Sequence, residues 1–372
     1  MIKNIHLKIH NKILIILSLG LLFIKITIYN IKLFPIIKKS KRYNNKENKL
    51  ILILTKWGES LDKNKILQEY PSPQFVRNSY LNLNGEWEYS LVEGNKKPKY
   101  NGKILAPFPI ESPLSGVFNK TLLPGMTLWN KKIVDLTKLK NKGRFLLHFG
   151  AMDQFTEVFI NNKKVGEHDG GYTSFNFDIT NYINDDLSKN IIVIKVIDNY
   201  SKDGAAFGKQ GIPRYHIFYV SVGGIWQTVW IESVPTTYIK DSKITPHFDN
   251  HSVSFLMSVE GNQKLDGHIK ILDNNEKIII NSSNIIPKIE LNIIISKNFR
   301  SWSPEDPYLY KVEYIYGEDV VKGYFGMRKF SIDLDKNNIK RLFLNNKPYF
   351  QNGVLDQDIG LMDIILLLLM KH

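Results

Sequence analysis

Apolar and polar residues alternate along much of the chain, and the alternation is clearest between Gly143 and Thr180. A period of two is the pattern of a half-buried β-strand, and Phe175, Phe177 and Ile179 show it. The pair Asn161-Asn162 separates two such runs and tolerates the positive φ of a tight hairpin turn. The stretch therefore predicts paired antiparallel strands at the centre of a β-sandwich.

Further strands are predicted on the carboxyl side of this centre. The run from Ile191 to Ile197 is almost entirely apolar, which predicts a strand that is buried on both faces. Residues Trp226 to Glu232 alternate again and predict a closing strand, after which Pro235 marks a boundary. Short alternating strands and turn pairs continue from Tyr238 to Ile332, which predicts a second sandwich of immunoglobulin-like size. Beyond it, Arg341 to Phe350 predicts a hairpin centred on Asn345-Asn346.

An apolar segment, residues 13–37, precedes the predicted strands. Lys25 divides it into two runs: the first has the length of a signal-peptide core, and both together are long enough to span a bilayer. No alanine occurs before Ala106, so a small-residue cleavage site is absent and an uncleaved signal-anchor is favoured. The basic cluster Lys38 to Arg42 argues against export, and a start codon assigned too far upstream is a second explanation. We expect a secreted or membrane-anchored protein, with a cytoplasmic one as the alternative.

The positive charge is concentrated in this leader. The net charge is +14, and residues 1–70 hold 14 Lys or Arg against 4 Asp or Glu, a surplus of 10 that leaves 4 for the rest. A basic face on the folded body is the main sign of nucleic-acid binding, so no nucleic-acid partner is expected. The sequence has no cysteine, which excludes disulfides and thiolate chemistry.

Five stretches occur in the order of a known family. They are the central stretch 143–180, Tyr70–Arg77 with Leu83–Trp87, Pro107–Gly116, Gly224–Glu232 and Trp302–Tyr310. Together they resemble glycoside hydrolase family 2, the family of β-galactosidases, β-glucuronidases and β-mannosidases. The resemblance implies hydrolysis of O-glycosyl bonds in β-glycosides with retention, a carbohydrate substrate and no organic cofactor.

The resemblance also implies a mainly β fold with four parts. Residues 1–54 are the leader and charged linker, 55–235 a jelly-roll sandwich of the galactose-binding-like, sugar-binding type, and 236–331 an immunoglobulin-like sandwich. Residues 332–372 resemble the start of a (β/α)8 catalytic barrel, which needs about 250 residues in full. Both catalytic glutamates of the family lie on later barrel strands, so no catalytic residue is assigned and the chain is expected to be an inactive fragment.

Asp356 and Gln357 are the candidate substrate-binding residues. They fall at the carboxyl end of the first barrel strand, where barrel enzymes keep their sites, and family members use the polar end of the corresponding stretch to hold sugar hydroxyls. This sequence departs from the Arg-Gly-Val-Asn-Arg-His type of pattern and reads Asn352-Gly-Val-Leu-Asp-Gln357. The alternative is that both residues merely cap the strand.

Three other groups of residues invite a functional interpretation, and a structural one is favoured for each. Glu305-Asp306 is a carboxylate pair, but flanking prolines make it a turn. Glu167-His168-Asp169 resembles a ligand set, yet neighbouring strand residues point to opposite faces and at most two share one ion. Trp226 and Trp230 are expected in the sandwich core rather than on a sugar-stacking platform.

The tail favours a truncation. Six consecutive apolar residues, Ile364 to Leu369, are too few to span a bilayer and lack the polar face of a solvated helix. We expect this tail not to be native to a working enzyme. Two alternatives to a truncated hydrolase stay open: a non-catalytic carbohydrate-binding or scaffold protein, and a non-functional gene fragment.

Overall fold

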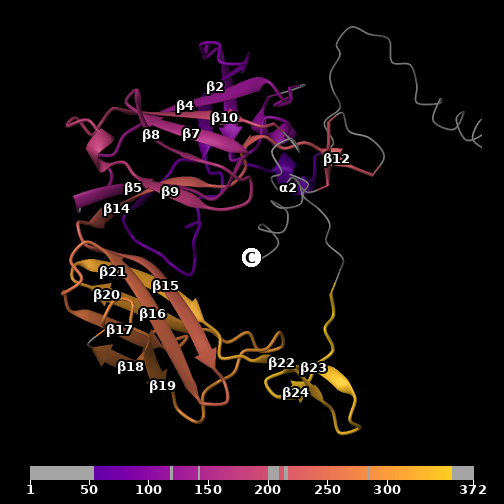
Figure 1. The fold of residues 1–372 in the computed structure, drawn as a ribbon, viewed down its shortest axis with the longest axis vertical. Coiled ribbons are helices and arrows are strands. Elements are labelled where there is room, and N and C mark those ends of the chain that lie inside the picture. The colour runs from indigo at the N-terminus through magenta and orange to yellow at the C-terminus, as the bar shows by residue number, and fades with distance from the viewer. Residues whose placement is uncertain are drawn as a thin grey trace, which may run out of the picture. The chain divides into compact units, whose positions relative to one another are not determined.

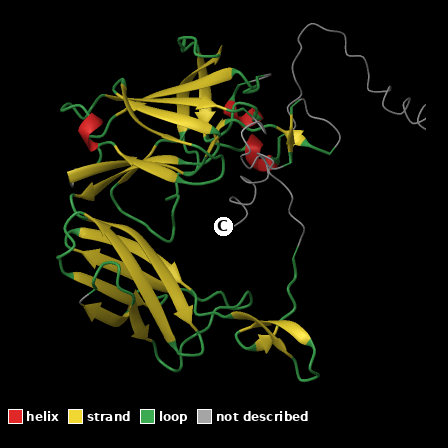
Figure 2. Cartoon of the chain, in the orientation of Figure 1, coloured by secondary structure: helices red, strands yellow, loops and turns green. Residues whose placement is uncertain are grey.

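The computed structural model describes residues 54–117, 120–140, 143–199, 209–212, 217–283 and 285–353. None of the helices in these ranges combines the length and the hydropathy needed to cross a bilayer. The apolar segment 13–37 and the tail after Gly353, with Asp356 and Gln357, lie outside the described residues. Within these ranges strands dominate and helices are limited to short turns (Figure 2).

The first folded body is a sandwich of two antiparallel sheets (Figure 1). The larger sheet has six strands, in the order β3 (Gly102–Ala106), β2 (Gly85–Glu93), β4 (Met126–Val134), β10 (Asn190–Ile197), β7 (Phe155–Ile160) and β8 (Lys163–His168). The smaller sheet has the order β1 (Tyr80–Asn82), β14 (Val229–Pro235), β5 (Gly143–Phe149) and β9 (Phe175–Asp178).

Short elements complete this body at the ends of the strands. They are α2 (Lys56–Glu59), the 3-10 turns η2 (Pro113–Ser115) and η3 (Thr180–Tyr182), and the paired strands β6 (Met152–Asp153) with β13 (Gly224–Ile225) and β11 (Gln210–Gly211) with β12 (Tyr219–Val220). The β6–β13 pair is antiparallel, whereas β11–β12 is parallel. Two of the buried polar residues discussed below, Asp153 of β6 and Gln210 of β11, belong to these elements.

The hairpin predicted at Asn161-Asn162 is confirmed. Asn161 and Asn162 have φ values of 49° and 66°, and they join the antiparallel strands β7 and β8. Positive φ at both central residues gives the turn the twist of the flanking strands, and asparagine is among the few residues that adopt it at low cost.

The prediction for Ile191 to Ile197 is wrong in one respect. On β10 the burial alternates: Ile192, Ile194 and Val196 are at most 1% exposed, whereas the residues between them are half-buried. The outer face of β10 carries Lys195, which pairs with Glu157 of β7 and lies over the ring of Trp129. Ile191 and Ile197 on that face stay half-buried, so the face is only partly covered.

The core of the first sandwich is apolar and closely packed. Trp87 is 1% exposed and its indole N–H donates to the carbonyl of Leu83 at 2.9 Å. Phe149 of β5 and Val158 of β7 are fully buried in the same apolar cluster, one from each sheet. Burying the indole with its donor satisfied avoids the cost of an unpaired polar group.

The second folded body is also a sandwich. One sheet has the order β15 (Tyr238–His247), β16 (Ser252–Glu260) and β19 (Leu291–Ile294), and the other β18 (Ile278–Ser283), β17 (Gly267–Leu272), β20 (Tyr310–Tyr316) and β21 (Asp319–Phe325). Phe255, Tyr314 and Tyr316 are the largest fully buried side chains of its separate core. Two sandwiches in a mainly β chain confirm the predicted fold class, whereas the described residues reach only the approach to the predicted barrel strand.

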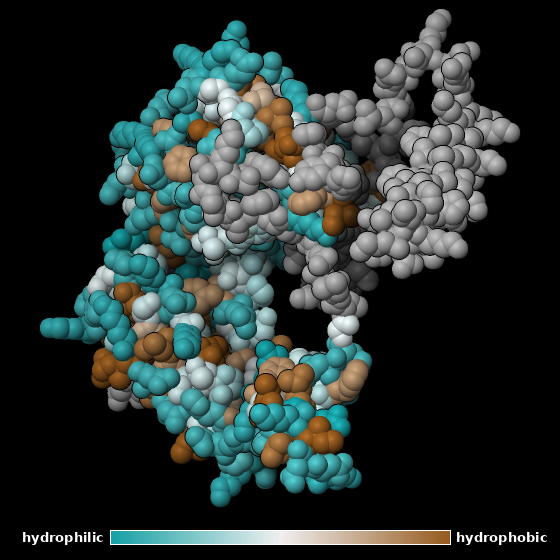
Figure 3. All heavy atoms as spheres, turned by 45° about the vertical axis from the view of Figure 1, so that its right-hand side comes forward, coloured by the Kyte–Doolittle hydropathy of each residue, from teal (hydrophilic) through white to brown (hydrophobic). Residues whose placement is uncertain are grey.

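A three-stranded sheet follows, made of β22 (Phe330–Leu334), β23 (Lys340–Leu344) and β24 (Lys347–Pro348). The predicted turn at Asn345-Asn346 is confirmed, with φ values of 51° and 63°. Several large apolar side chains of this sheet and of the residues around it are about half exposed or more, and brown atoms gather there in Figure 3. They are Phe330, Ile332, Leu334, Ile339, Leu342 and Phe350.

Gly323 of β21 lies where the segment around Gln74 crosses the second sandwich. Val76 and Lys322 exchange backbone hydrogen bonds of 2.7 and 2.9 Å at this crossing. A Cβ on Gly323 would lie 2.5 Å from the carbonyl oxygen of Gln74, which is backbone and cannot rotate away. We expect Gly323→Ala to lower the free energy of unfolding by about 1–3 kcal/mol, as overpacking does, measured by urea titration.

Gly58→Ala is the matched control. Its added Cβ would meet Leu114 at 3.5 Å, an ordinary van der Waals contact, on the short helix α2. Alanine is the better helix former, so Gly58→Ala is expected to leave the stability unchanged or slightly higher. Equal stability of Gly323→Ala and the unchanged chain would mean that the crossing segment shifts at no cost.

Candidate functional site

Three carboxyl groups, two of them buried and one half-buried, form a polar cluster in the first sandwich. Glu111 lies in the loop after β3, Asp153 ends β6, and Asp198 directly follows β10. Asp153 and Asp198 are 7% and 4% exposed. The charge of Asp198 raises the pKa of both Glu111 and Asp153, and the charge of Glu111 also raises the pKa of Asp153, as expected for neighbouring carboxyl groups.

Glu111 is held by the backbone. Its two carboxyl oxygens accept hydrogen bonds from the amides of Leu122 at 2.8 Å and Gly223 at 3.0 Å. Burial raises the pKa of Glu111 to about 7; the amide hydrogen bonds lower it, and the charge of Asp198 raises it. The amides therefore fix the orientation of the group without keeping it fully ionised at neutral pH.

The loop that contains Gly171 covers the carboxyl group of Asp153. Burial raises the pKa of Asp153 to about 7, the charge of Asp198 adds to the rise, and a hydrogen bond with Gln210 opposes it. A Cβ on Gly171 would lie 2.8 Å from the carboxyl carbon of Asp153, so the β8–β9 loop passes directly over the carboxyl group. The Asp153–Gln154 peptide bond is cis.

Two aromatic side chains form the rim of this cluster. Tyr172 is 38% exposed, and its ring meets the ring of Trp226 edge to face at 5.9 Å. The indole N–H of Trp226 donates to the carbonyl of Gly171 at 2.7 Å. The carboxamide oxygen of Gln210 accepts from the amide of Val222 at 2.7 Å, which ties β11 to the same place.

This arrangement suits hydroxyl groups better than a metal. Carboxyl groups with pKa values near 7 are partly protonated at neutral pH, so each can donate as well as accept a hydrogen bond. Exposed aromatic rings beside convergent polar groups are typical of small-molecule sites. Within the part of the chain that the structure describes, no group of three or more His, Cys, Asp or Glu residues is placed to hold a metal ion.

The structure supports the structural interpretation of Glu305-Asp306. Asp306 accepts two hydrogen bonds from Arg300, at 2.7 and 2.8 Å, and Glu305 accepts one from the hydroxyl of Tyr349 at 2.7 Å. Glu305 is exposed and Asp306 is half-buried, and both lie in a bend between strands. The predicted site residues Asp356 and Gln357 lie outside the described residues and stay a prediction.

The other two candidate groups are the segment Glu167-His168-Asp169 and the two tryptophans. Glu167 pairs with Lys164, and His168 stacks on Phe175 with 4.0 Å between ring centroids, so this strand end is occupied by its own neighbours. Trp230 is 6% exposed, but it lies on the face of β14 opposite the core residues Val229 and Ile231 and stacks on His148, so the prediction of a place in the sandwich core is wrong for this residue. The core prediction is also wrong for Trp226, because this residue lies between β13 and β14 at the rim of the carboxyl cluster.

Sequence reasoning missed Glu111, Asp153 and Asp198 as a group. Each of the three directly follows an apolar residue: Glu111 follows Ile110, Asp153 follows Met152, and Asp198 follows the predicted strand Ile191 to Ile197. This pattern is the signal that the sequence offers. A carboxylate in such a place needs partners, and only the folded chain shows that the partners are other carboxylates.

Comparison with known proteins agrees with this fold. The family model for the sugar binding domain of glycosyl hydrolases family 2 matches residues 79–235, and a second model, glycosyl hydrolases family 2, matches residues 237–328. The chain belongs to glycosyl hydrolase family 2.

Curated family 2 relatives are considerably longer. A putative β-glucuronidase of Formosa agariphila is 27% identical over 292 residues, which are 74% of this chain and 33% of that protein. A β-glucuronidase of Streptococcus agalactiae is 24% identical, covering 76% and 48%. A β-galactosidase of Thermoanaerobacter pseudethanolicus is 29% identical over 193 residues, covering 50% and 25%. The chain thus spans between a quarter and a half of the length of these relatives.

Solved structures of family 2 members share the fold. β-Glucuronidases of an uncultured Clostridium species and of Faecalibacterium prausnitzii both superpose with a TM-score of 0.57, at 19% and 20% sequence identity. The superpositions cover 74% and 73% of this chain but 49% of each of those chains.

Proposed function

We propose that this chain is the sandwich half of a retaining β-glycosidase and that it contributes sugar-binding groups rather than the catalytic carboxylates. The observation that carries the proposal is the cluster of Glu111, Asp153 and Asp198 in a family 2 sugar-binding-type sandwich. Protonatable carboxyls beside the rings of Tyr172 and Trp226 match the hydroxyl groups and apolar faces of a pyranose.

Two further features support the proposal that this chain binds sugar while the catalytic glutamates lie in the barrel. The chain covers about half or less of the relatives' length, and the family resemblance assigns both catalytic glutamates to the barrel. Hydrolysis with retention needs two carboxyl groups about 5–5.5 Å apart on opposite sides of the glycosidic bond. In the proposed whole protein, Asp356 and Gln357 hold sugar hydroxyls at the first barrel strand.

The preferred substrate is a β-glucuronide. Two relatives that align over about three quarters of this chain are named a putative β-glucuronidase, from Formosa, and a β-glucuronidase, from Streptococcus. A β-galactoside is the second substrate class to test, since the Thermoanaerobacter relative is named a β-galactosidase.

The purified chain is expected to hydrolyse no aryl β-glucuronide, β-galactoside or β-mannoside. Without a positioned acid/base and nucleophile it lacks general acid–base catalysis, which alone contributes about 10²–10⁴ in rate. A chromogenic assay at micromolar protein measures this. Turnover at the rate of an intact enzyme would contradict the proposed division of labour.

A chimaera tests the glycosidase role directly. Residues 79–328 replace the matching segment of the Streptococcus β-glucuronidase, and circular dichroism and thermal unfolding confirm that the product folds. The proposal expects β-glucuronide hydrolysis, with a raised KM when Asp198 is changed to alanine. A folded chimaera that prefers β-galactosides would overturn the choice of substrate.

A further inference from the structure

Arg328 differs from the other arginines in the described part of the chain. Four of these arginines form ion pairs with carboxylates: Arg77 with Glu232 and Asp319, Arg144 with Asp178, Arg300 with Asp306, and Arg341 with Asp335. Arg328 is exposed and has no carboxylate partner among the described residues. Its guanidinium instead lies over the rings of Trp302, at 4.6 Å, and Phe330, at 5.4 Å.

The aromatic support under Arg328 is rigid. The amide of Trp302 donates to the carbonyl of Met327 at 2.9 Å, and Gly326 leaves room for the indole, since a Cβ there would lie 3.0 Å from the Trp302 side chain. Stacking on aromatic faces orients a guanidinium and leaves its N–H donors free at the edge. Arg328 is therefore a cation held in place with its hydrogen-bonding capacity unused.

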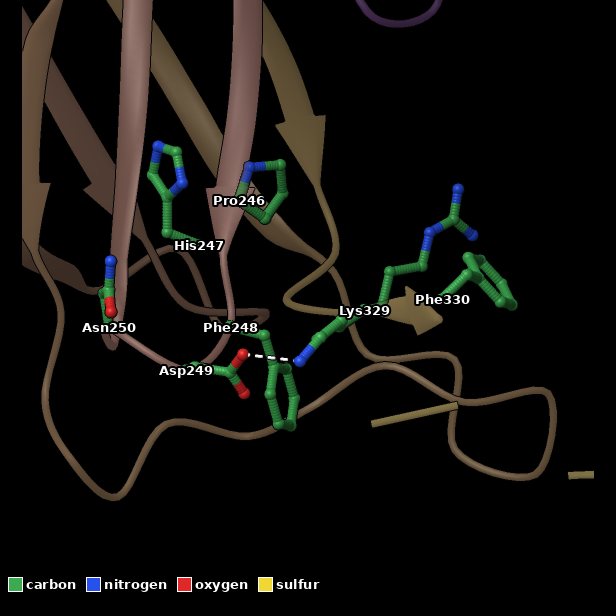
Figure 4. A pocket seen from close by; sticks show the side chains of 8 residues that line it. Pro246, His247, Phe248, Asp249, Asn250, Lys329 and Phe330 are labelled. Atoms are coloured by element: carbon green, nitrogen blue, oxygen red, sulfur yellow. Dashed lines mark hydrogen bonds and ion pairs between the residues drawn. The ribbon is translucent and has the colours of Figure 1, made fainter. Parts of the chain in front are cut away.

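Nearby carboxylates are already engaged elsewhere. Asp249 accepts from the ammonium of Lys329 and from the side-chain carboxamide of Asn346, both at 2.6 Å. Figure 4 shows Lys329 turned toward Asp249, while Phe330 projects away from this ion pair. Glu305 and Asp306, close to Trp302 in sequence, are bound by Tyr349 and Arg300 respectively. The positive charge of Arg328 is thus left for a ligand.

A pocket of about 370 Å³ opens beside this cation. His247 and Asn250 add hydrogen-bonding side chains to its wall, and Phe330, which is 56% exposed, adds an apolar face. The ring nitrogen Nε2 of His247 is bound to the hydroxyl of Ser254 at 2.8 Å, which fixes the imidazole. The lining consists of Pro246, His247, Phe248, Asp249, Asn250, Arg328, Lys329 and Phe330.

We propose that this pocket binds an acidic sugar unit. The guanidinium of Arg328 takes the anionic group, since its planar fork fits a carboxylate through two parallel hydrogen bonds. The paired side chains of Asp249 and Lys329 offer hydrogen-bonding groups to the hydroxyls, and Phe330 offers an apolar face to the ring. Uronates and sulfated sugars share this chemistry, and the planar carboxylate of a uronate fits the fork better. The second sandwich then holds an anionic saccharide without any contribution from a barrel.

A polypeptide is the competing occupant. The apolar side chains of β22 and β23, Ile332 and Leu342, are exposed close by in sequence and are typical of a protein interface. The wall of the pocket itself, however, is dominated by charged and amide side chains, and its volume suits one small polar molecule. We therefore place the sugar in the pocket and treat the polypeptide as an outcome of the test.

The test is titration of the full chain with glucuronate, glucose, glucose 6-sulfate and acetate, followed by saturation-transfer NMR. Glucuronate is expected to bind, and glucose 6-sulfate to bind more weakly. Glucose lacks the anionic group and acetate lacks the sugar ring, so both are expected to bind at least about tenfold more weakly than glucuronate. Arg328→Gln is expected to weaken glucuronate binding by about tenfold or more. Binding in the unchanged chain is also expected to weaken with added salt.

Arg300→Gln is the matched control. Arg300 is likewise an exposed arginine over an aromatic ring, 4.7 Å from Tyr308, but Asp306 already neutralises it. Its loss is expected to leave glucuronate binding unchanged. Equal weakening by both variants would overturn the proposal in favour of general electrostatic attraction. Absence of glucuronate binding to the unchanged chain would overturn it in favour of a polypeptide over Arg328 and Phe330.

Discussion

Replacing Arg77 with alanine is expected to lower the free energy of unfolding by about 3–5 kcal/mol, because it leaves two buried carboxylates without their cation. Arg77 is 4% exposed and pairs with Glu232 of the first sandwich and Asp319 of the second, each at 2.9 Å. Asp319 is fully buried, and its carboxylate also accepts from the amide of Ile239 at 2.9 Å. Urea unfolding at neutral pH measures the loss.

The loss should depend on pH in a defined direction. Burial alone would raise the pKa of Glu232, but the hydrogen bond and charge of His148 and the charge of Arg77 hold it at about 2. A carboxylate with a lowered pKa stabilises the fold above its unfolded pKa and loses that contribution as the pH falls toward the folded value. The Arg77→Ala deficit is therefore expected to shrink between about pH 4.5 and about pH 2.

Arg300→Ala provides the comparison for this variant. Its pair with Asp306 has a similar separation, 2.7 Å, but both side chains are about half exposed. Solvent screens exposed pairs, so the variant is expected to leave the unfolding midpoint unchanged within error. An Arg77→Ala protein as stable as Arg300→Ala would show that the buried network adjusts or admits water.

Local chemistry explains which parts of the fold could be predicted from sequence. The turns at Asn161-Asn162 and Asn345-Asn346 depend on positive φ at adjacent asparagines, and the alternating strands around them depend on burial of one face. Both kinds of information lie within about ten residues of chain. Contacts between distant residues do not lie within such a range. Arg77 and Asp319 are 242 positions apart, and no local sequence pattern predicts that they pair.

The position of Trp226 shows that the conformation of a single residue can interrupt a strand that the alternation of apolar residues predicts. Alternation from Trp226 to Glu232 predicted one strand with both tryptophans in the core. Gly224 instead adopts a φ of 89°, β13 ends at Ile225, and β14 begins only at Val229. Trp226 therefore leaves the strand and bonds to Gly171, which brings it to the carboxyl cluster. The carboxyl cluster forms from three segments that are distant in sequence, and the periodicity of apolar residues does not show which segments lie together in the fold.

Replacing Asp153 with asparagine is expected to raise stability at about pH 8 by a few kcal/mol and to leave it nearly unchanged at about pH 4.5. Burial and the charge of Asp198 raise the pKa of Asp153 from 3.8 to about 7. Between these values the folded chain keeps a proton that the unfolded chain releases, so the free energy of unfolding of the unchanged chain falls as the pH rises through this window. Asparagine fills the same space, keeps an oxygen for Gln210 and cannot ionise.

The control for Asp153→Asn is Asp135→Asn, the same change at an exposed position of the same sandwich. Hydrogen bonds from the hydroxyl and amide of Thr137 lower the pKa of Asp135, so its removal offers no gain at high pH. Urea unfolding of both variants at several pH values separates the effects. A stability that falls between about pH 4 and about pH 7 as steeply in Asp153→Asn as in the unchanged chain would contradict the assignment. In that case the titrating group is Glu111, whose pKa is also raised to about 7 by burial, and Glu111→Gln then flattens the profile instead.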